Sequence, residues 1–348
     1  MKKRKRLYIL SGLVMFLCMG TIYSWSVFRG PLIKELELIS GEHIGATLAQ
    51  MPYTLFLLMY SFTMPFSGKL IKKIDPRILC ISGSLLVALG WILAGSSTSI
   101  YQIMWTYGVL GGLGVGIVYG VPIAIVTEWF PHRKGLAVGI TLMGFGISPL
   151  ISAPIANALI NKSGVFQAFK DMGFAFALVL GLLSLLFQFP KEKIELHKIS
   201  KNEVEFTTKE MLKTKSFYAL WACFVIGTFV GLTMVGIASI YAQETVGLKR
   251  ETATILLSVF AIFNGIGRPI FGSLVDKIGT KKTIYLSYTL IAISSLLQII
   301  KSENTVIFIV SFILFFLNLG GWLSIVPAAN VFSTTFLTKT KVLYVFVL

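Results

Sequence analysis

The residue of this sequence best suited to bind a ligand is an arginine inside an apolar segment. Arg268 interrupts the otherwise uncharged run 252–275 and is flanked by Gly267 and Pro269. A charge at the middle of a membrane-spanning helix costs about 2.5–3.5 kcal/mol on insertion scales, so it needs a compensating partner. A planar guanidinium can hold a carboxylate through two parallel hydrogen bonds. A small carboxylate anion is therefore the natural transient partner of Arg268.

The spacing around Arg268 gives its helix one polar face. Asn264, Arg268 and Gly272 follow one another at i, i+4 and i+8, so they share a face, and this favours an interior orientation and anion binding. The alternatives are a structural ion pair or snorkelling. Arg268 is about seven residues, roughly 10 Å, from the inner helix end, from which a long side chain can reach the headgroups.

The side chains that most often catalyse reactions or bind metals do not cluster into an active site or a metal site. The carboxylates fall in loops or at helix ends, and the three cysteines and three histidines lack metal-ligand spacing. Intramembrane catalysis needs clusters of such groups. We therefore expect no enzyme, no metal and no cofactor.

The composition places these residues in a lipid bilayer. The chain is 55% hydrophobic and 13% charged, with a mean hydropathy of +0.81, and a spanning helix needs about 20 apolar residues. Uncharged windows predict six spans in the first half and four in the second, with 78–127 long enough for two. The windows are 7–28, 44–67, 78–127, 135–161, 172–190, 216–243, 252–275, 283–300 and 304–338.

These spans predict an all-α membrane protein with three parts. Residues 1–189 form a six-helix bundle, 190–216 a charged cytoplasmic linker, and 217–348 an incomplete bundle of about four helices. A cytoplasmic N-terminus places most of the 31 Lys and Arg residues in inside loops, as the positive-inside rule requires. That topology explains the net charge of +16 without nucleic acid. We expect a monomer in the cell membrane.

A basic loop occurs twice, each time after the second apolar segment of its half. Residues 68–77 and 272–282 are these loops, which indicates a duplicated set of membrane helices and hence a transporter. The candidate gating residues of the two loops are Gly68, Arg77, Gly272, Asp276, Lys277, Gly279, Lys281 and Lys282.

Glycine spacing predicts a close helix contact in the fourth span. Gly108, Gly112, Gly116 and Gly120 recur every four residues, so they fall near one face and let a neighbouring backbone approach. The next span carries glycines as well, followed by Pro149 and Pro154, which bend a helix.

These features resemble the major facilitator superfamily and, more narrowly, its oxalate/formate antiporter family. The loop 272–282 fits the superfamily's loop signature, whereas the first copy has Lys72 in place of Asp and Asp75 in place of Gly. The narrower resemblance rests on residues 21–28, 129–137 and 264–272. It implies two six-helix bundles that rock around a central site and exchange small carboxylates, such as oxalate for formate.

The resemblance also suggests site residues. Arg268 matches the family's substrate-binding arginine, and Tyr23, Tyr119 and Trp322 match aromatic cavity residues. After residues 327–330 the family continues into an eleventh helix with a second cation, whereas this sequence changes character at Val331. We hypothesise a truncated or disrupted reading frame there. The alternatives to the carboxylate exchanger are a monocarboxylate carrier for pyruvate or formate, and an inactive remnant.

Overall fold

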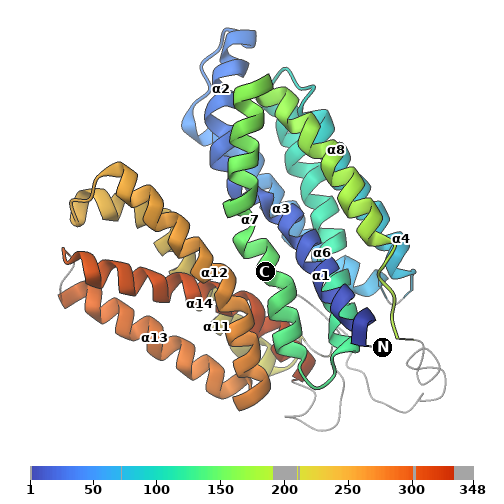
Figure 1. The fold of residues 1–348 in the computed structure, drawn as a ribbon, viewed down its shortest axis with the longest axis vertical. Coiled ribbons are helices and arrows are strands. Elements are labelled where there is room, and N and C mark those ends of the chain that lie inside the picture. Colours follow the sequence, from blue (N-terminus) through green and yellow to red (C-terminus); the bar gives the residue numbers. More distant parts are fainter. Residues whose placement is uncertain (1, 72, 191–209, 211, 301–302, 333–348) are drawn as a thin grey trace. The chain divides into compact units, whose positions relative to one another are not determined.

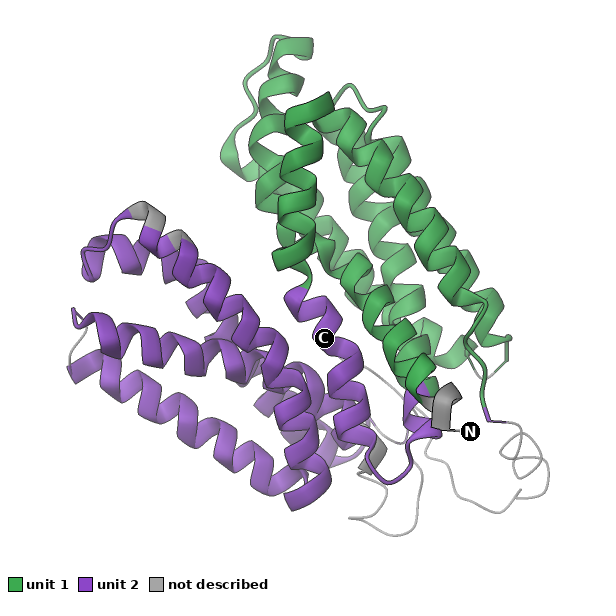
Figure 2. Cartoon of the chain, in the orientation of Figure 1, with its two compact units in different colours: residues 1–125, 148–189, 346–348 green, residues 126–147, 190–345 purple. Residues whose placement is uncertain are grey.

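The computed structural model describes residues 2–71, 73–190, 210, 212–300 and 303–332, and their regular structure is entirely helical (Figure 1). This confirms the predicted all-α class. The helices belong to two compact units (Figure 2). The first consists mainly of residues 1–125 and 148–189, and the second of 126–147 and 190–345. Most of the predicted linker, Lys72 and the residues after Phe332 lie outside the described residues.

The described part of the first unit consists of long α-helices, one short α-helix, a 3-10 helix and a π-helix. Its elements are α1 (Lys2–Met19), the 3-10 helix η1 (Gly20–Ser24), α2 (Trp25–Ser40), α3 (Ala46–Leu70), α4 (Pro76–Ala94), α5 (Ile100–Ile103), the π-helix η2 (Met104–Gly111), most of α6 (Gly112–Trp129), the second part of α7 (Lys134–Ser163) and α8 (Val165–Ser184).

In its described residues, the second unit contains four long helices, the end of α6 and the first part of α7. The elements after the linker are α11 (Lys215–Ile240), the π-helix η3 (Tyr241–Thr245), α12 (Arg250–Ile278), α13 (Thr280–Ile300) and α14 (Thr305–Phe332). α7 contributes its residues up to Ile147 to this unit.

Nine helical segments in the described part of the chain are long and apolar enough to cross a membrane. Each coincides with one of the ten predicted spans. The remaining predicted span, 44–67, is α3, which is 25 residues long and is not among the nine. Its two prolines and its hydroxyl-bearing residues lower its hydropathy.

Helices extend beyond the uncharged windows that predicted them. The window 172–190 corresponds to α8, which begins seven residues earlier and includes Asp171, whose carboxylate accepts a hydrogen bond of 2.8 Å from Gln167. Likewise, the first window ends at Phe28, whereas α2 continues to Ser40. Charges limit how far a helix lies in lipid, but they do not interrupt its backbone hydrogen bonds.

In the first unit the predicted glycine face lies against α3. A methyl group at Gly112 would lie 2.5 Å from the carbonyl oxygen of Phe56, and one at Gly116 would lie 2.7 Å from that of Tyr60. Gly108 likewise faces the carbonyl oxygen of Pro52, whereas Gly120 faces the side-chain hydroxyl of Ser67. The absence of side chains therefore lets these helices approach to backbone contact, as small residues do in membranes.

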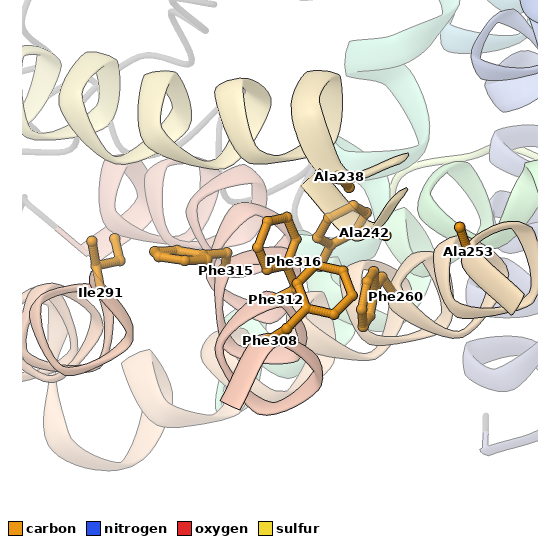
Figure 3. Close-up of a cluster of buried hydrophobic side chains, with 9 residues drawn as sticks. All are labelled: Ala238, Ala242, Ala253, Phe260, Ile291, Phe308, Phe312, Phe315 and Phe316. Carbon is orange, nitrogen blue, oxygen red and sulfur yellow. The ribbon is translucent and has the colours of Figure 1, made fainter. Parts of the chain in front are cut away.

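In the second unit aromatic side chains fill one end of the core. Phe308, Phe312 and Phe316 recur every four residues along α14 and pack against one side of Phe260 of α12, with their ring centroids 5.4 to 5.8 Å from that of Phe260 (Figure 3). Closer to the C-terminal end of α14, glycines occupy the positions that face α12. Gly320 of α14 packs directly on the backbone carbonyl of Asn264. This contact brings α14 against the part of α12 that carries Arg268.

Candidate functional site

Arg268 lies where α12 is packed tightly on two sides. On one side Gly139 of α7 contacts the Arg268 carbonyl, and on the other Gly267 contacts the carbonyl of Leu317 on α14. The hydroxyl of Ser324 also donates to the Arg268 carbonyl oxygen at 2.8 Å. Because both neighbouring backbones are so close, Arg268 has an exposed fraction of 0%.

The guanidinium group is only partly satisfied by the protein. Nη1 donates to the carbonyl oxygen of Leu142 at 2.8 Å, and the guanidinium carbon lies 5.7 Å from the ring centroid of Phe145. Nε and Nη2 are buried and have no hydrogen-bond partner among the described residues. They lie on the same edge of the guanidinium plane, which is the edge that holds a carboxylate with two parallel bonds. The site thus presents a bidentate anion-binding edge.

The alternative interpretations of Arg268 do not match this geometry. A snorkelling side chain keeps its charged end in water, whereas this side chain is wholly buried. No carboxylate in the described ranges pairs with it, and it is the one charged residue among the described residues that are buried. Such a charge is costly without a partner.

Asn264 lies one helical turn before Arg268 and faces the same part of α7. Its Oδ1 is buried and has no hydrogen-bond partner in the described part of the chain. A methyl group placed on Gly146 would lie 3.1 Å from Arg268 Nε and 3.2 Å from Asn264 Oδ1. The structure therefore brings the two predicted residues together. Leu142, Phe145 and Gly146 complete the site from α7. Gly146 belongs to the glycines noted in that span, but none of the three was predicted as a site residue.

Of the three predicted aromatic residues, only Trp322 belongs to the unit that contains Arg268. The indole of Trp322 packs on Gly227 of α11 and lies 5.3 Å from the ring of Tyr288 on α13. Its Nε1 is buried, with no hydrogen-bond partner within the residues that the structure describes. Tyr119 and Tyr23 belong to the first unit.

Tyr119 is a packed aromatic of α6, and Tyr23 lies in the short 3-10 helix η1. The ring of Tyr119 lies 4.8 Å from that of Phe16 and 5.2 Å from that of Tyr60, with 4% of its surface exposed. Tyr23 is partly buried. Their role as cavity residues stays a prediction.

The predicted loop 272–282 is helical except at Gly279, because α12 continues to Ile278 and α13 begins at Thr280. Its part within α12 contacts the start of α7. The carboxylate of Asp276 accepts hydrogen bonds from the backbone N–H groups of Gly135 at 2.8 Å and Leu136 at 2.7 Å. These are free donors in the first turn of α7, where the helix dipole favours a negative charge. Gly272 packs backbone to backbone on Gly135. A carboxylate from another helix thus caps α7.

The rest of this loop is exposed and basic. Gly279 ends α12 with a φ of 81°, a conformation that glycine adopts without strain. Lys277, Lys281 and Lys282 are exposed around it.

The first basic loop has a different, purely local contact. Asp75 caps its own helix α4, because its Oδ1 accepts from the backbone N–H of Arg77 at 2.8 Å. Gly68 is buried in the last turn of α3. The first loop departs from the family signature at Asp75, and there the carboxylate caps its own helix, unlike Asp276, which contacts a different helix.

Long apolar helices that enclose a buried arginine define a multi-pass integral membrane protein. The chain belongs to the major facilitator superfamily, whose family model matches residues 8–344. It is therefore a membrane transporter.

Two curated proteins and one solved structure illustrate the similarity. The chain is 30% identical to the oxalate:formate antiporter of Oxalobacter formigenes, over 94% of this chain and 77% of that protein. It is also 30% identical to human monocarboxylate transporter 12, over 64% of this chain and 49% of that protein. The outward-facing crystal structure of the transporter FucP superposes with a TM-score of 0.64 at 15% identity, over 93% of this chain and 89% of that one.

Proposed function

We propose that this transporter exchanges small carboxylates such as oxalate and formate across the membrane by alternating access, and that Arg268 binds the anion. The unpaired Nε and Nη2 edge of Arg268 is the observation that carries the proposal. Its third donor group is anchored to Leu142, so the free edge is held in a fixed direction. A bound carboxylate neutralises the charge and satisfies both donors.

The names of similar proteins support the same class of substrate. One relative is an oxalate:formate antiporter and another is a monocarboxylate transporter. Both names denote carriers of small carboxylates. The shared chemistry is a carboxylate group, which is what the free edge of Arg268 can recognise.

The contact between Asp276 and α7 is the proposed gate. It consists of two charge-assisted hydrogen bonds and one glycine contact, all of which break together if the two helices separate. Such a contact gives a transporter two discrete arrangements rather than a continuous range. We infer that it stabilises one of the alternating states.

A monocarboxylate carrier is the second candidate. Arg268 is the one buried cation among the described residues, and one guanidinium edge matches one carboxylate group. A competition panel of oxalate, formate, acetate and pyruvate against labelled formate separates the two candidates. A dicarboxylate exchanger is inhibited most strongly by oxalate, whereas a monocarboxylate carrier is inhibited most strongly by the singly charged acids.

Counterflow in proteoliposomes tests the role of Arg268. The Arg268→Gln variant keeps hydrogen-bonding ability but loses the charge and the rigid fork, so we expect at least about a 100-fold loss of carboxylate exchange. The Arg29→Gln variant is the control, because Arg29 is exposed and, as far as the described residues go, donates to Gln50 alone, at 3.2 Å. Equal exchange by Arg268→Gln and wild type would refute the proposal.

A further inference from the structure

Basic side chains lie on both sides of the contact between Asp276 and α7. Arg133 lies two residues before Gly135, whose backbone N–H donates to Asp276 at 2.8 Å, and Lys277 directly follows Asp276. Both basic side chains are exposed. The contact therefore brings like charges towards each other from two helices, and like charges repel.

Two further cations extend this positive charge along the first turn of α13. Lys281 and Lys282 are exposed and follow the turn at Gly279. We call these cations the basic surface, which consists of Arg133, Lys277, Lys281 and Lys282. Within the described ranges, none of the four forms an ion pair with a carboxylate.

The nearest carboxylates do not neutralise the basic surface. Both oxygens of Asp276 accept from backbone N–H groups of α7. Glu128 and Lys134 lie on either side of the turn between α6 and α7 and cancel each other in charge. The closed contact is thus left with an excess of positive charge around it.

The basic surface lies at the ends of helices that are long and apolar enough to cross a membrane. Arg133 directly precedes the segment Lys134–Ser163, and Lys277 lies at the end of Ile255–Ile278. The two lysines of α13 are followed by exposed apolar side chains, among them Tyr285 and Leu286. A ligand with an anionic head and acyl chains matches both features, whereas a free anion or a nucleic acid matches only the charge.

We propose that the basic surface binds the phosphate head group of an anionic phospholipid and that this lipid stabilises the closed contact between α7 and α12. This inference rests on the proposed gate at Asp276. The phosphate offsets the repulsion between Arg133 on one side and the three lysines on the other. When the helices separate, one head group no longer reaches both sides. The lipid therefore binds the closed state more tightly and shifts the equilibrium towards it.

A soluble phospholipid tests the site on the purified protein in detergent, without transport. Dihexanoyl phosphatidylglycerol is the anionic probe, and dihexanoyl phosphatidylcholine, which has no net charge, is its control. Inorganic phosphate tests a free anion as the ligand. A ligand that binds the folded protein raises the melting temperature with its concentration. We expect a saturable rise with phosphatidylglycerol and none with the other two.

The double variant Lys281→Gln with Lys282→Gln tests the location of the site. A cation near the membrane surface changes the affinity for anionic lipid about fivefold, so we expect the Kd for phosphatidylglycerol to rise about 30-fold. Lys69→Gln with Lys73→Gln is the matched control, because these lysines are exposed in the first basic loop. Its Kd should equal that of the wild type.

The Asp276→Asn variant separates coupling to the gate from simple charge attraction. It removes a negative charge beside the basic surface, so charge attraction alone would strengthen the binding of phosphatidylglycerol. It also weakens the contact that the lipid recognises. We therefore expect binding to become about 10-fold weaker, a typical size for a coupling between two states.

Each result decides one part of the inference. Absence of phosphatidylglycerol binding, or equal binding of phosphatidylcholine, would overturn the lipid site, and an equal response to inorganic phosphate would replace it by a free-anion site. An equal loss in the two double variants would overturn its location. Tighter binding by Asp276→Asn would overturn its coupling to the gate. No carboxylate is used, so failure of the proposed exchange is seen separately, in counterflow.

Discussion

The two units use glycine contacts for different purposes. In the first, Gly112 and its neighbours bring α6 and η2 against α3, and the contact is made of backbone and uncharged side-chain atoms. In the second, Gly139 and Gly146 bring α7 against α12, and the contact encloses Arg268. The comparison indicates that close glycine packing by itself serves only to stabilise the fold. A site arises where the same kind of packing holds a charge that the protein leaves partly unpaired.

Replacing Arg268 by an apolar residue should have the largest effect, which is to lower transport while raising the stability of the protein. The Arg268→Met variant removes a buried charge with two unpaired donors, so we expect exchange to fall at least about 100-fold while the protein becomes more stable. Apolar replacement of buried charged groups often gains about 1–4 kcal/mol. Thermal unfolding and counterflow measure both effects. A lower melting temperature would instead indicate a mainly structural arginine.

Replacing a glycine in the first unit should instead lower the stability of the protein. In Gly112→Val the new side chain would collide with the carbonyl of Phe56 on α3, and overpacking costs about 1–3 kcal/mol or more. We expect a lower melting temperature and a reduced yield of monodisperse protein. Gly181→Val is the control, since no atom lies within 4 Å of an added methyl group there. Similar behaviour of the two variants would show that the α3 contact is not tight.

The two basic loops allow a third and smaller comparison. Asp276→Asn weakens two hydrogen bonds between helices, so we expect turnover to fall about 10-fold, a typical size for a coupling between two states. Binding at Arg268 should stay unchanged. Asp75→Asn weakens only the cap of α4, so turnover should remain near that of the wild type. Equal turnover in the two variants would contradict the proposed gating role of Asp276.

The sequence predicted the helices well because their signal is local. Long uncharged windows are sufficient to locate spans, and four-residue glycine spacing is sufficient to define a face. The windows misplaced helix ends, as at α8, because Lys170 and Asp171 sit within the helix. A charge marks the edge of the apolar stretch and not the last hydrogen bond.

The sequence predicted only half of the site, for a reason that is also physical. Asn264 and Arg268 share a face of one helix, so their spacing alone brings them together. Leu142, Phe145 and Gly146 come from α7, which meets α12 only through tertiary packing. Trp322 shows the same limit, because its ring packs on Gly227 and Tyr288, a choice of neighbours that no spacing encodes.

The most direct test of the central claim is carboxylate binding to the purified protein by titration calorimetry. Formate, acetate and glycolate are titrated into wild type, Arg268→Met and Arg29→Gln. We predict saturable binding of at least one of these anions to wild type and to Arg29→Gln, and none to Arg268→Met. Binding of the same anion to Arg268→Met with wild-type affinity would contradict the assignment of Arg268 as the anion-binding residue.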